Sequence, residues 1–217
     1  MEKIYFDETT FVWKTKINFS QFKEQLLSES YRVIDEAINS KFDAYGYKSS
    51  VYNLDFIGDI TISNKLDEIY QLSIDICKEL WNESNSKGFN IINTDSWVNV
   101  VKSNNPSQIN FKHNDIKMVN KYHTHTELNK ANDRFIPHYT YVYYIQMPDV
   151  MEGEDGVLYF KGNNDKEYWI RPEEDDLIIM PADMPHAPNS APNATIDRIV
   201  LAGNIGFDLI KKQKSLI

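Results

Sequence analysis

The chain has 217 residues, of which 41% are hydrophobic, and a formal net charge of −9 at neutral pH. This length and composition are typical of one folded domain with a substantial core, and they exclude a disordered chain. The acidic balance disfavours duplex nucleic acid as a partner, because Lys- and Arg-rich faces bind its phosphates. The sequence has no apolar run of about 18 residues that would span a membrane, and its charged start does not resemble a signal peptide. We therefore expect a cytoplasmic protein with no membrane partner.

Cysteine usage narrows the chemistry further. Cys77 is the only cysteine, which excludes an internal disulfide and a Cys-rich zinc module. Any bound metal must therefore be held by His and carboxylate side chains. Cys77 falls on the apolar side of a helical pattern, so we expect a buried structural thiol rather than a reactive one.

Helical periodicity marks the first 90 residues. Apolar side chains recur at helical spacing between residues 20 and 42, and Ser20 is a candidate N-cap. Residues 64–84 repeat the pattern, with Asn64 as the candidate cap. The sequence predicts a single domain over residues 1–217, in which this helix-rich part packs on a sheet formed by the remainder.

After residue 90 the pattern changes to short runs rich in β-branched and aromatic residues, bounded by Gly, Pro, Asn and Asp. These runs predict strands at residues 97–101, 138–148, 156–160, 166–170, 175–182 and 198–207. No helical pattern separates them, so we expect a mostly β fold with flanking helices, an antiparallel sandwich or barrel. Residues 102–120 lack a period and predict a long loop, and the acidic run 173–176 predicts a solvated turn.

Candidate metal ligands cluster around residue 125. In an extended strand, residues two apart project to the same face, so His123, His125 and Glu127 can all point one way. Two such ligands can reach one ion at about 2.0–2.2 Å. The adjacent pair is therefore either His123 with His125 or His125 with Glu127, and the third ligand must come from elsewhere.

His186 is the candidate for that third ligand, because it follows an apolar strand and a Pro-rich turn. Two close ligands and a distant one would leave three positions on an ion open for cosubstrate and O₂. Twelve residues later, Arg198 opens an apolar strand. A guanidinium binds a carboxylate with two parallel hydrogen bonds, so Arg198 is a candidate anion-binding residue.

The order of these residues resembles the iron(II)- and 2-oxoglutarate-dependent dioxygenases, in which a His-x-His or His-x-acid pair precedes a distal His and then an Arg. Surrounding stretches resemble one uncharacterised branch of that superfamily, frequent in bacteriophages and marine bacteria. The matching stretches are 96–100, 123–125, 141–148, 156–160, 177–181, His186 and 198–204. Together they cover roughly residues 90–207.

This resemblance implies a double-stranded β-helix, or jelly-roll, core over residues 91–210. It also implies an Fe(II) enzyme that uses 2-oxoglutarate and O₂ to hydroxylate an unidentified substrate. In the branch, His123, His125 and His186 would be the metal ligands, whereas the wider superfamily favours Glu127 in place of His123.

The resemblance further implies that Arg198 binds the distal carboxylate of 2-oxoglutarate, with help from Tyr144 or Thr140. A homodimer is possible, and a phage-encoded protein would act in the host cytoplasm. Two alternatives stay open. A cupin shares the jelly roll but needs neither 2-oxoglutarate nor Arg198, and a catalytically silent jelly roll would serve as a structural or binding module.

Overall fold

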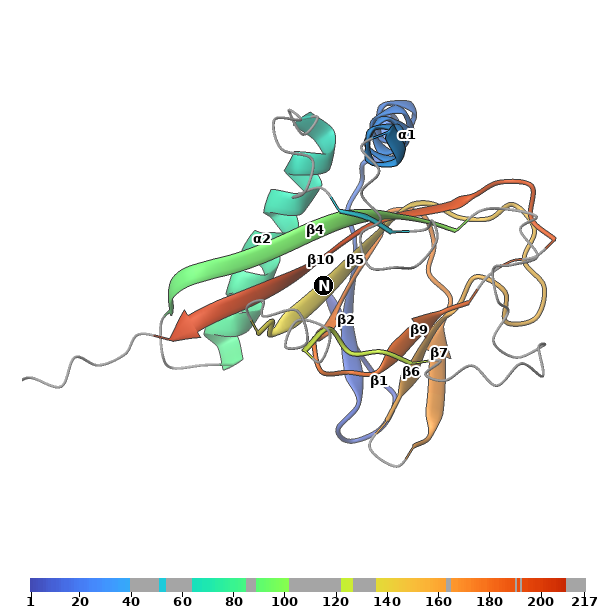
Figure 1. Ribbon diagram of the computed structural model, residues 1–217. Helices are drawn as coiled ribbons and strands as arrows, with labels where there is room; N and C mark the ends of the chain where they lie inside the picture. The colour runs from blue at the N-terminus through green and yellow to red at the C-terminus, as the bar shows by residue number, and fades with distance from the viewer. Residues whose placement is uncertain are drawn as a thin grey trace, which may run out of the picture.

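The computed structural model contains two facing β-sheets, with two α-helices on the outer side of the larger sheet (Figure 1). It describes residues 1–39, 51–53, 64–84, 89–101, 122–126, 136–162, 165–189, 191 and 193–209. The fold is an antiparallel jelly roll with flanking helices, as the strand pattern and the family resemblance together imply. Within this described part, no helix combines the length and apolarity needed to cross a bilayer.

The larger sheet has seven strands in the order β1-β2-β8-β5-β10-β4-β3. These are β1 (Glu2–Tyr5), β2 (Phe11–Lys16), β3 (Val51–Asn53), β4 (Phe89–Val101), β5 (Tyr139–Gln146), β8 (Asp176–Pro181) and β10 (Arg198–Leu209). The smaller sheet, in the order β7-β6-β9, consists of β6 (Leu158–Lys161), β7 (Glu167–Ile170) and β9 (His186–Pro188). All strand pairs in the described part of the chain are antiparallel, and β10 lies in the larger sheet between β5 and β4.

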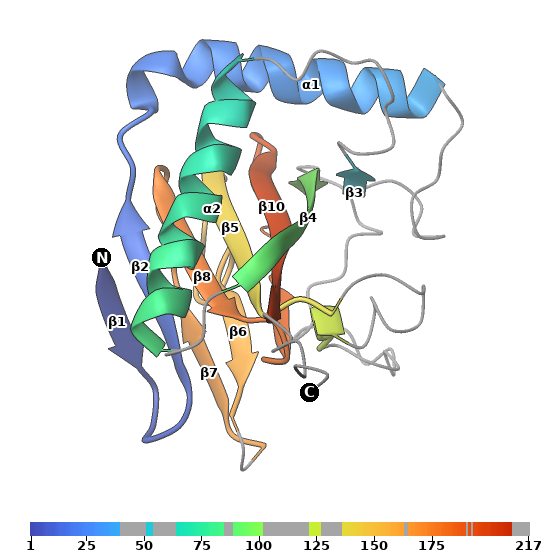
Figure 2. The ribbon, with the colours of Figure 1, turned by 90° about the vertical axis from the view of Figure 1, so that its left-hand side faces the viewer.

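All six strands predicted after residue 90 are present. A seventh strand in this region, β9, was not predicted, because it is only three residues long and includes a proline. The strands from the N-terminal part of the chain, β1, β2 and β3, were also not predicted; β1 and β2 extend one side of the larger sheet (Figure 2). The signal for β2 was present in the β-rich run over residues 11–16. The predicted loop over residues 102–120 lies outside the described residues.

Two helices account for the helical periodicity. α2 (Asn64–Ser84) has the predicted bounds, whereas α1 (Lys23–Asn39) begins three residues later than expected. The chain first makes a 3₁₀ turn, η1 (Ser20–Phe22), so Ser20 is not the N-cap of α1 and that prediction is wrong. The Ser20 hydroxyl instead donates to Oδ1 of Asn18 at 2.8 Å.

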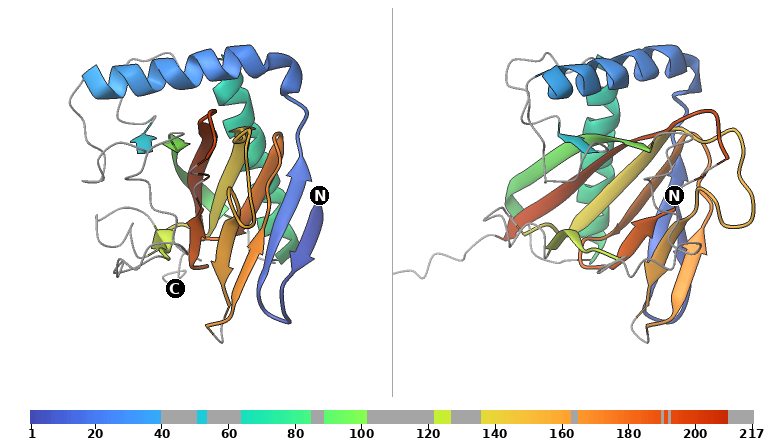
Figure 3. Two further views of the ribbon diagram at one scale, coloured as in Figure 1. Left: turned by 90° about the vertical axis from the view of Figure 1, so that its right-hand side faces the viewer. Right: turned by 45° about the vertical axis from the view of Figure 1, so that its right-hand side comes forward.

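The alternation of β5 creates two cores. Tyr139, Tyr141 and Tyr143 face the helices, where Cys77 of α2 is buried as predicted. Burial raises the pKa of the Cys77 thiol, so it stays protonated. The intervening residues Val142 and Tyr144 face the smaller sheet and form a second core between the sheets. Figure 3 shows this separation of helices and small sheet to opposite sides.

The acidic run 173–176 contains the predicted turn, at Glu174 and Asp175, but its last residue begins β8 and is not solvated. Asp176 is fully buried, and Lys14 of β2 reaches it with an Nζ–Oδ2 distance of 2.9 Å. Lys16 approaches the other carboxylate oxygen at 3.6 Å. A buried carboxylate requires such partners, and the two lysines on adjoining β2 supply them.

Lys14→Met should therefore lower the free energy of unfolding by about 2 kcal/mol, because it removes the closer partner of a buried carboxylate. Urea denaturation measures this change. Lys78→Met is the matched control, since Lys78 pairs with an exposed Asp75 and should change stability by less than about 0.5 kcal/mol. Equal losses of unfolding free energy in the two variants would show that Lys14 does not compensate a buried charge.

Gly203 marks the tightest approach in the larger sheet. A Cβ at this position would meet the backbone oxygen of Asp95 and lie 2.6 Å from the hydroxyl of Tyr141. Gly203→Ala should therefore cost about 3 kcal/mol of unfolding free energy through overpacking. Thermal unfolding measures this loss. A Gly203→Ala variant that melts at the wild-type temperature would contradict the prediction, because it would show that the strands move apart without cost.

Candidate metal and anion site

Three histidines are brought together by the connection between β8 and β9. His123 and His186 pair through two backbone hydrogen bonds, with N–O distances of 3.2 and 3.1 Å. The backbone N–H of His125 donates to the carbonyl of Ala182 at 2.9 Å. Both neighbouring histidines are thus tied by their backbones to the segment that carries the distal one.

The local backbone differs from the expectation of an extended strand. His123 forms a single β-bridge, and the chain is already helical at His125 and Thr126. Strand alternation therefore does not explain why the imidazoles converge. They converge because the chain turns directly after the bridge, where the backbone N–H groups of His125 and Thr126 both donate to the carbonyl of Ala182.

The imidazole rings form a compact cluster. The Nε2 atoms of His125 and His186 lie 3.2 Å apart, and each of the three rings, His123 included, offers a nitrogen within 4.8 Å of the others. Two nitrogens bound to one ion at about 2.1 Å, with an angle of about 100° between them, would lie roughly 3.2 Å apart. The spacing therefore suits a shared metal ion.

The cluster is electrically neutral. Burial lowers the pKa of His125 and of His186, and it lowers the pKa of His123 to about 3. Nδ1 of His186 lies 3.0 Å from the carbonyl oxygen of Met184, to which it donates as an N–H. That bond leaves the lone pair of its Nε2 facing His125, the form in which histidine binds a metal.

Arg198, the first residue of β10, is buried with only 4% of its surface exposed. Its Nη1 donates to the backbone carbonyl of Asn189 at 3.1 Å, while its buried Nε has no hydrogen-bond partner. No carboxylate in the described part of the chain forms an ion pair with it. Burial lowers the pKa of the guanidinium, which nevertheless stays charged at neutral pH.

The pairing of β5 with β10 shows where Tyr144 and Thr140 lie relative to Arg198 on the inner face of the larger sheet. Tyr144 pairs with Val200, two residues from Arg198 on the same face, and burial keeps its hydroxyl protonated by raising its pKa. Thr140 pairs with Asn204 further along β10, and its hydroxyl donates to Oδ1 of Asn204 at 2.9 Å. Tyr144 thus accompanies Arg198, whereas Thr140 lies toward the other end of the face.

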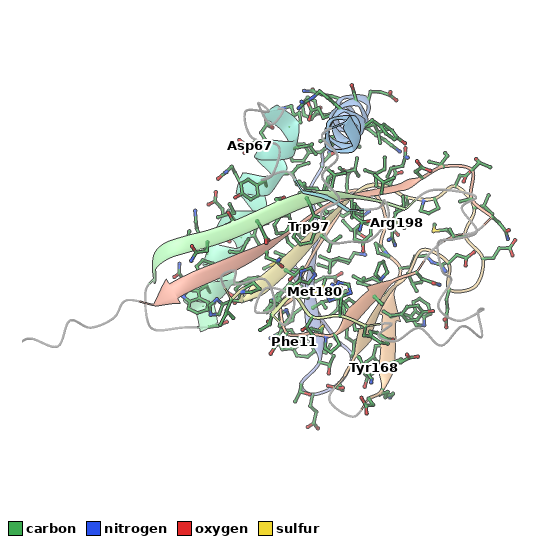
Figure 4. The ribbon with its side chains drawn as sticks, viewed as in Figure 1. Phe11, Asp67, Trp97, Tyr168, Met180 and Arg198 are labelled. Atoms are coloured by element: carbon green, nitrogen blue, oxygen red, sulfur yellow. The ribbon has the colours of Figure 1, made fainter. Side chains whose placement is uncertain are left out.

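Trp97 of β4 lies between these two ends and was assigned no role from the sequence. It pairs with Ala202, and its indole stacks on the imidazole of His125 with ring centroids 5.4 Å apart. Figure 4 labels Trp97 and Arg198. The inner face therefore runs from the histidine cluster, past Trp97, to Arg198.

The sequence offers one alternative ligand and two further histidines, to which it assigns no ligand role. Glu127, the alternative ligand, and His113 lie outside the described residues. His138 is exposed, and its Nδ1 accepts a hydrogen bond from the backbone N–H of Phe207 at 3.1 Å. The contact of Arg198 with Asn189 had no sequence signal, because it is made by a backbone carbonyl.

No protein-family model matches the sequence, and no curated protein matches it. Several solved structures, in contrast, resemble the fold of this chain. A prolyl-4-hydroxylase from Pseudomonas putida superposes with a TM-score of 0.55 at 14% identity, covering 89% of this chain and 91% of that one. This chain therefore shares the jelly-roll fold of that hydroxylase.

Two further oxygenases show the same likeness. A prolyl hydroxylase from Trichoplax adhaerens, in complex with a hypoxia inducible factor fragment, has a TM-score of 0.53 at 15% identity, with coverages of 91% and 83%. A dioxygenase for auxin oxidation from Arabidopsis thaliana, in a binary complex with 2-oxoglutarate, has a TM-score of 0.55 at 13% identity, with coverages of 89% and 82%. In this chain the shared fold places His186 on the smaller sheet and Arg198 on the larger one.

Proposed function

We propose that the protein is a non-haem Fe(II)- and 2-oxoglutarate-dependent oxygenase that hydroxylates a substrate still to be identified. His123, His125 and His186 hold the metal, and Arg198 with Tyr144 binds the cosubstrate. One observation carries the proposal. Three neutral imidazoles converge beside the smaller sheet, and the larger sheet carries on its inner face a buried guanidinium that has no ion pair in the described part of the chain.

The histidine cluster fits a divalent metal. Three uncharged nitrogen donors leave the full +2 charge on the ion, which the two carboxylates of 2-oxoglutarate would offset. Three protein ligands also leave coordination positions open for small molecules. Without an ion, the short contact between Nε2 of His125 and Nε2 of His186 has to share one proton or lose its hydrogen bond.

Arg198 fits the distal carboxylate of the cosubstrate. An unpaired buried charge is costly, and a bound carboxylate would compensate it through a two-pronged hydrogen bond. The hydroxyl of Tyr144 makes no hydrogen bond within the described part of the chain, so it is free to donate to the same carboxylate. Thr140 stays a sequence prediction, since its hydroxyl is already engaged by Asn204.

Arg198 also separates the proposal from its alternatives. A cupin would use the histidine cluster but has no need for a buried cation beyond it. A catalytically silent jelly roll would need neither feature, and burial of both would then only reduce its stability. The proposed function is the one that uses both groups.

The residues of the chain contribute binding, orientation and exclusion of water. When bound, Fe(II) and 2-oxoglutarate supply the oxidative chemistry, consuming O₂, releasing succinate and CO₂, and placing one oxygen atom on the substrate. Arg198 and Tyr144 fix one end of the cosubstrate, and the histidines fix the other. Apolar side chains of the inter-sheet core, among them Val200 and Met180, shield the space between.

Anaerobic titration of the protein with Fe(II) and then 2-oxoglutarate tests the proposal. We expect a weak visible charge-transfer band that saturates at one equivalent of each. Succinate in place of 2-oxoglutarate should give no band, because it lacks the keto group that chelates the metal. A spectrum that never changes on adding 2-oxoglutarate would contradict the proposal.

Single substitutions decide which residues bind the metal. His123→Ala should abolish Fe(II) binding, because it removes one of three ligands, whereas Glu127→Gln should leave the affinity within about threefold. Calorimetry on the metal-free protein measures both. Loss of binding in Glu127→Gln with retention in His123→Ala would instead assign the alternative ligand set.

Three narrower predictions rest on the sequence and belong to this proposal. They are membership of the phage and marine-bacterial branch, a homodimeric state and a cytoplasmic location. Sedimentation analysis of the full chain measures the second of these.

A further inference from the structure

Among the described residues, the imidazole of His125 finds no counterpart of the hydrogen bond that orients His186. In His186, Nδ1 is fixed by the carbonyl of Met184 at 3.0 Å. For the ring of His125, the only hydrogen-bond contact with the described residues is that of Nε2 with Nε2 of His186. Metal-binding histidines normally donate their second ring nitrogen to a carbonyl or carboxylate, which fixes the plane of the ring.

Trp97 is the group that meets the flat face of this ring. The indole and the imidazole are nearly parallel, with an interplanar angle of 18° and centroids 5.4 Å apart. This separation lies within the range of favourable offset stacking. Trp97 projects from β4, which is held by long pairing with β10, so the indole rests on a rigid element.

The sheet provides room for this stack. Directly across from Trp97, β10 has Ala202, whose methyl group leaves the neighbouring surface uncrowded. The backbone N–H of His125 is tied to Ala182, which sets where the residue lies but not how its ring is rotated. Rotation of the ring is restricted by its stacking on Trp97 and its contact with His186.

We propose that Trp97 is a positioning residue of the metal site. Its indole sets the plane of the His125 imidazole and so aims Nε2 toward the point shared with His186. The inference rests on the proposed metal site and assigns to a stacking contact the task that a hydrogen bond performs for His186.

Co(II) titration of the full-length, metal-free protein tests the inference through absorbance in the visible range and through tryptophan fluorescence. Trp97→Leu should bind Co(II) about tenfold more weakly than wild type and with an altered visible spectrum. Trp97→Phe keeps a flat ring and should retain affinity within about threefold. Trp169→Leu removes an exposed tryptophan on β7 and should leave Co(II) affinity and spectrum unchanged.

Fluorescence gives a readout that does not depend on the folding of Trp97→Leu. Co(II) beside the indole should quench much of the wild-type emission, and this quenching should be largely lost in Trp97→Phe. Unchanged quenching in Trp97→Phe, or a wild-type Co(II) affinity and spectrum in a folded Trp97→Leu, would overturn the positioning role alone. Failure of the wild-type protein to bind Co(II) at all would overturn the proposed metal site together with it.

Discussion

Replacing Arg198 with methionine is expected to weaken 2-oxoglutarate binding by at least about 100-fold, because it removes the buried partner of the distal carboxylate. The same substitution should raise the unfolding free energy of the ligand-free protein by about 1 kcal/mol, since methionine fills much of the space without an uncompensated charge. Calorimetry and urea denaturation measure the two effects. Gain of stability with loss of binding is the signature of a residue retained for its ligand.

Arg171→Met is the matched control for this prediction. Arg171 is exposed and donates to the backbone carbonyl of Gly153, so its loss should alter neither 2-oxoglutarate affinity nor metal affinity. Metal binding should also survive in Arg198→Met. Equal 2-oxoglutarate affinities in wild type and Arg198→Met would contradict the role assigned to Arg198.

His186→Ala is expected to lower Fe(II) affinity by at least about 100-fold, because the substitution removes the one ligand that comes from the smaller sheet. The remaining pair, His123 and His125, would bind the ion from one side only. Anaerobic calorimetry with Fe(II) measures the loss, and circular dichroism verifies the fold.

His138→Ala provides the comparison for His186→Ala. His138 is an exposed histidine that bonds to the backbone of Phe207, outside the histidine cluster. Its removal should leave Fe(II) affinity unchanged. A stoichiometric Fe(II) site that persists in His186→Ala would show that the metal binds elsewhere.

Hydrophobic patterning was sufficient for most of the fold. Six of the strands after residue 90 and the bounds of α2 were predictable because each of these elements buries one face or both, and a buried face gives a periodic pattern of apolar residues. β9 left no such record, since three residues are too few to show a period. The 3₁₀ turn at Ser20–Phe22 was missed because a serine before a helical pattern does not reveal which turn begins the helix.

The histidine cluster was predictable in its members but not in its geometry. The spacing of His123 and His125 suggested a strand, whereas tertiary hydrogen bonds to Ala182 and His186 produce the convergence. Such contacts join residues roughly 60 positions apart and leave no local pattern. The stack between Trp97 and His125 was unpredictable for the same reason. Strand alternation predicts which face of a sheet a side chain is on, but not which residue of another segment it contacts.

Calorimetric titration of 2-oxoglutarate into the full-length protein under anaerobic conditions, with and without one equivalent of Fe(II), tests the central claim most directly. Since Arg198 and the histidine cluster bind opposite ends of one molecule, we expect one 2-oxoglutarate per chain and an affinity at least about tenfold higher when Fe(II) is present. Fe(II) should reciprocally bind more tightly when 2-oxoglutarate is present. An affinity for 2-oxoglutarate that is undetectable in both titrations, or identical in the two, would contradict a shared metal and cosubstrate site.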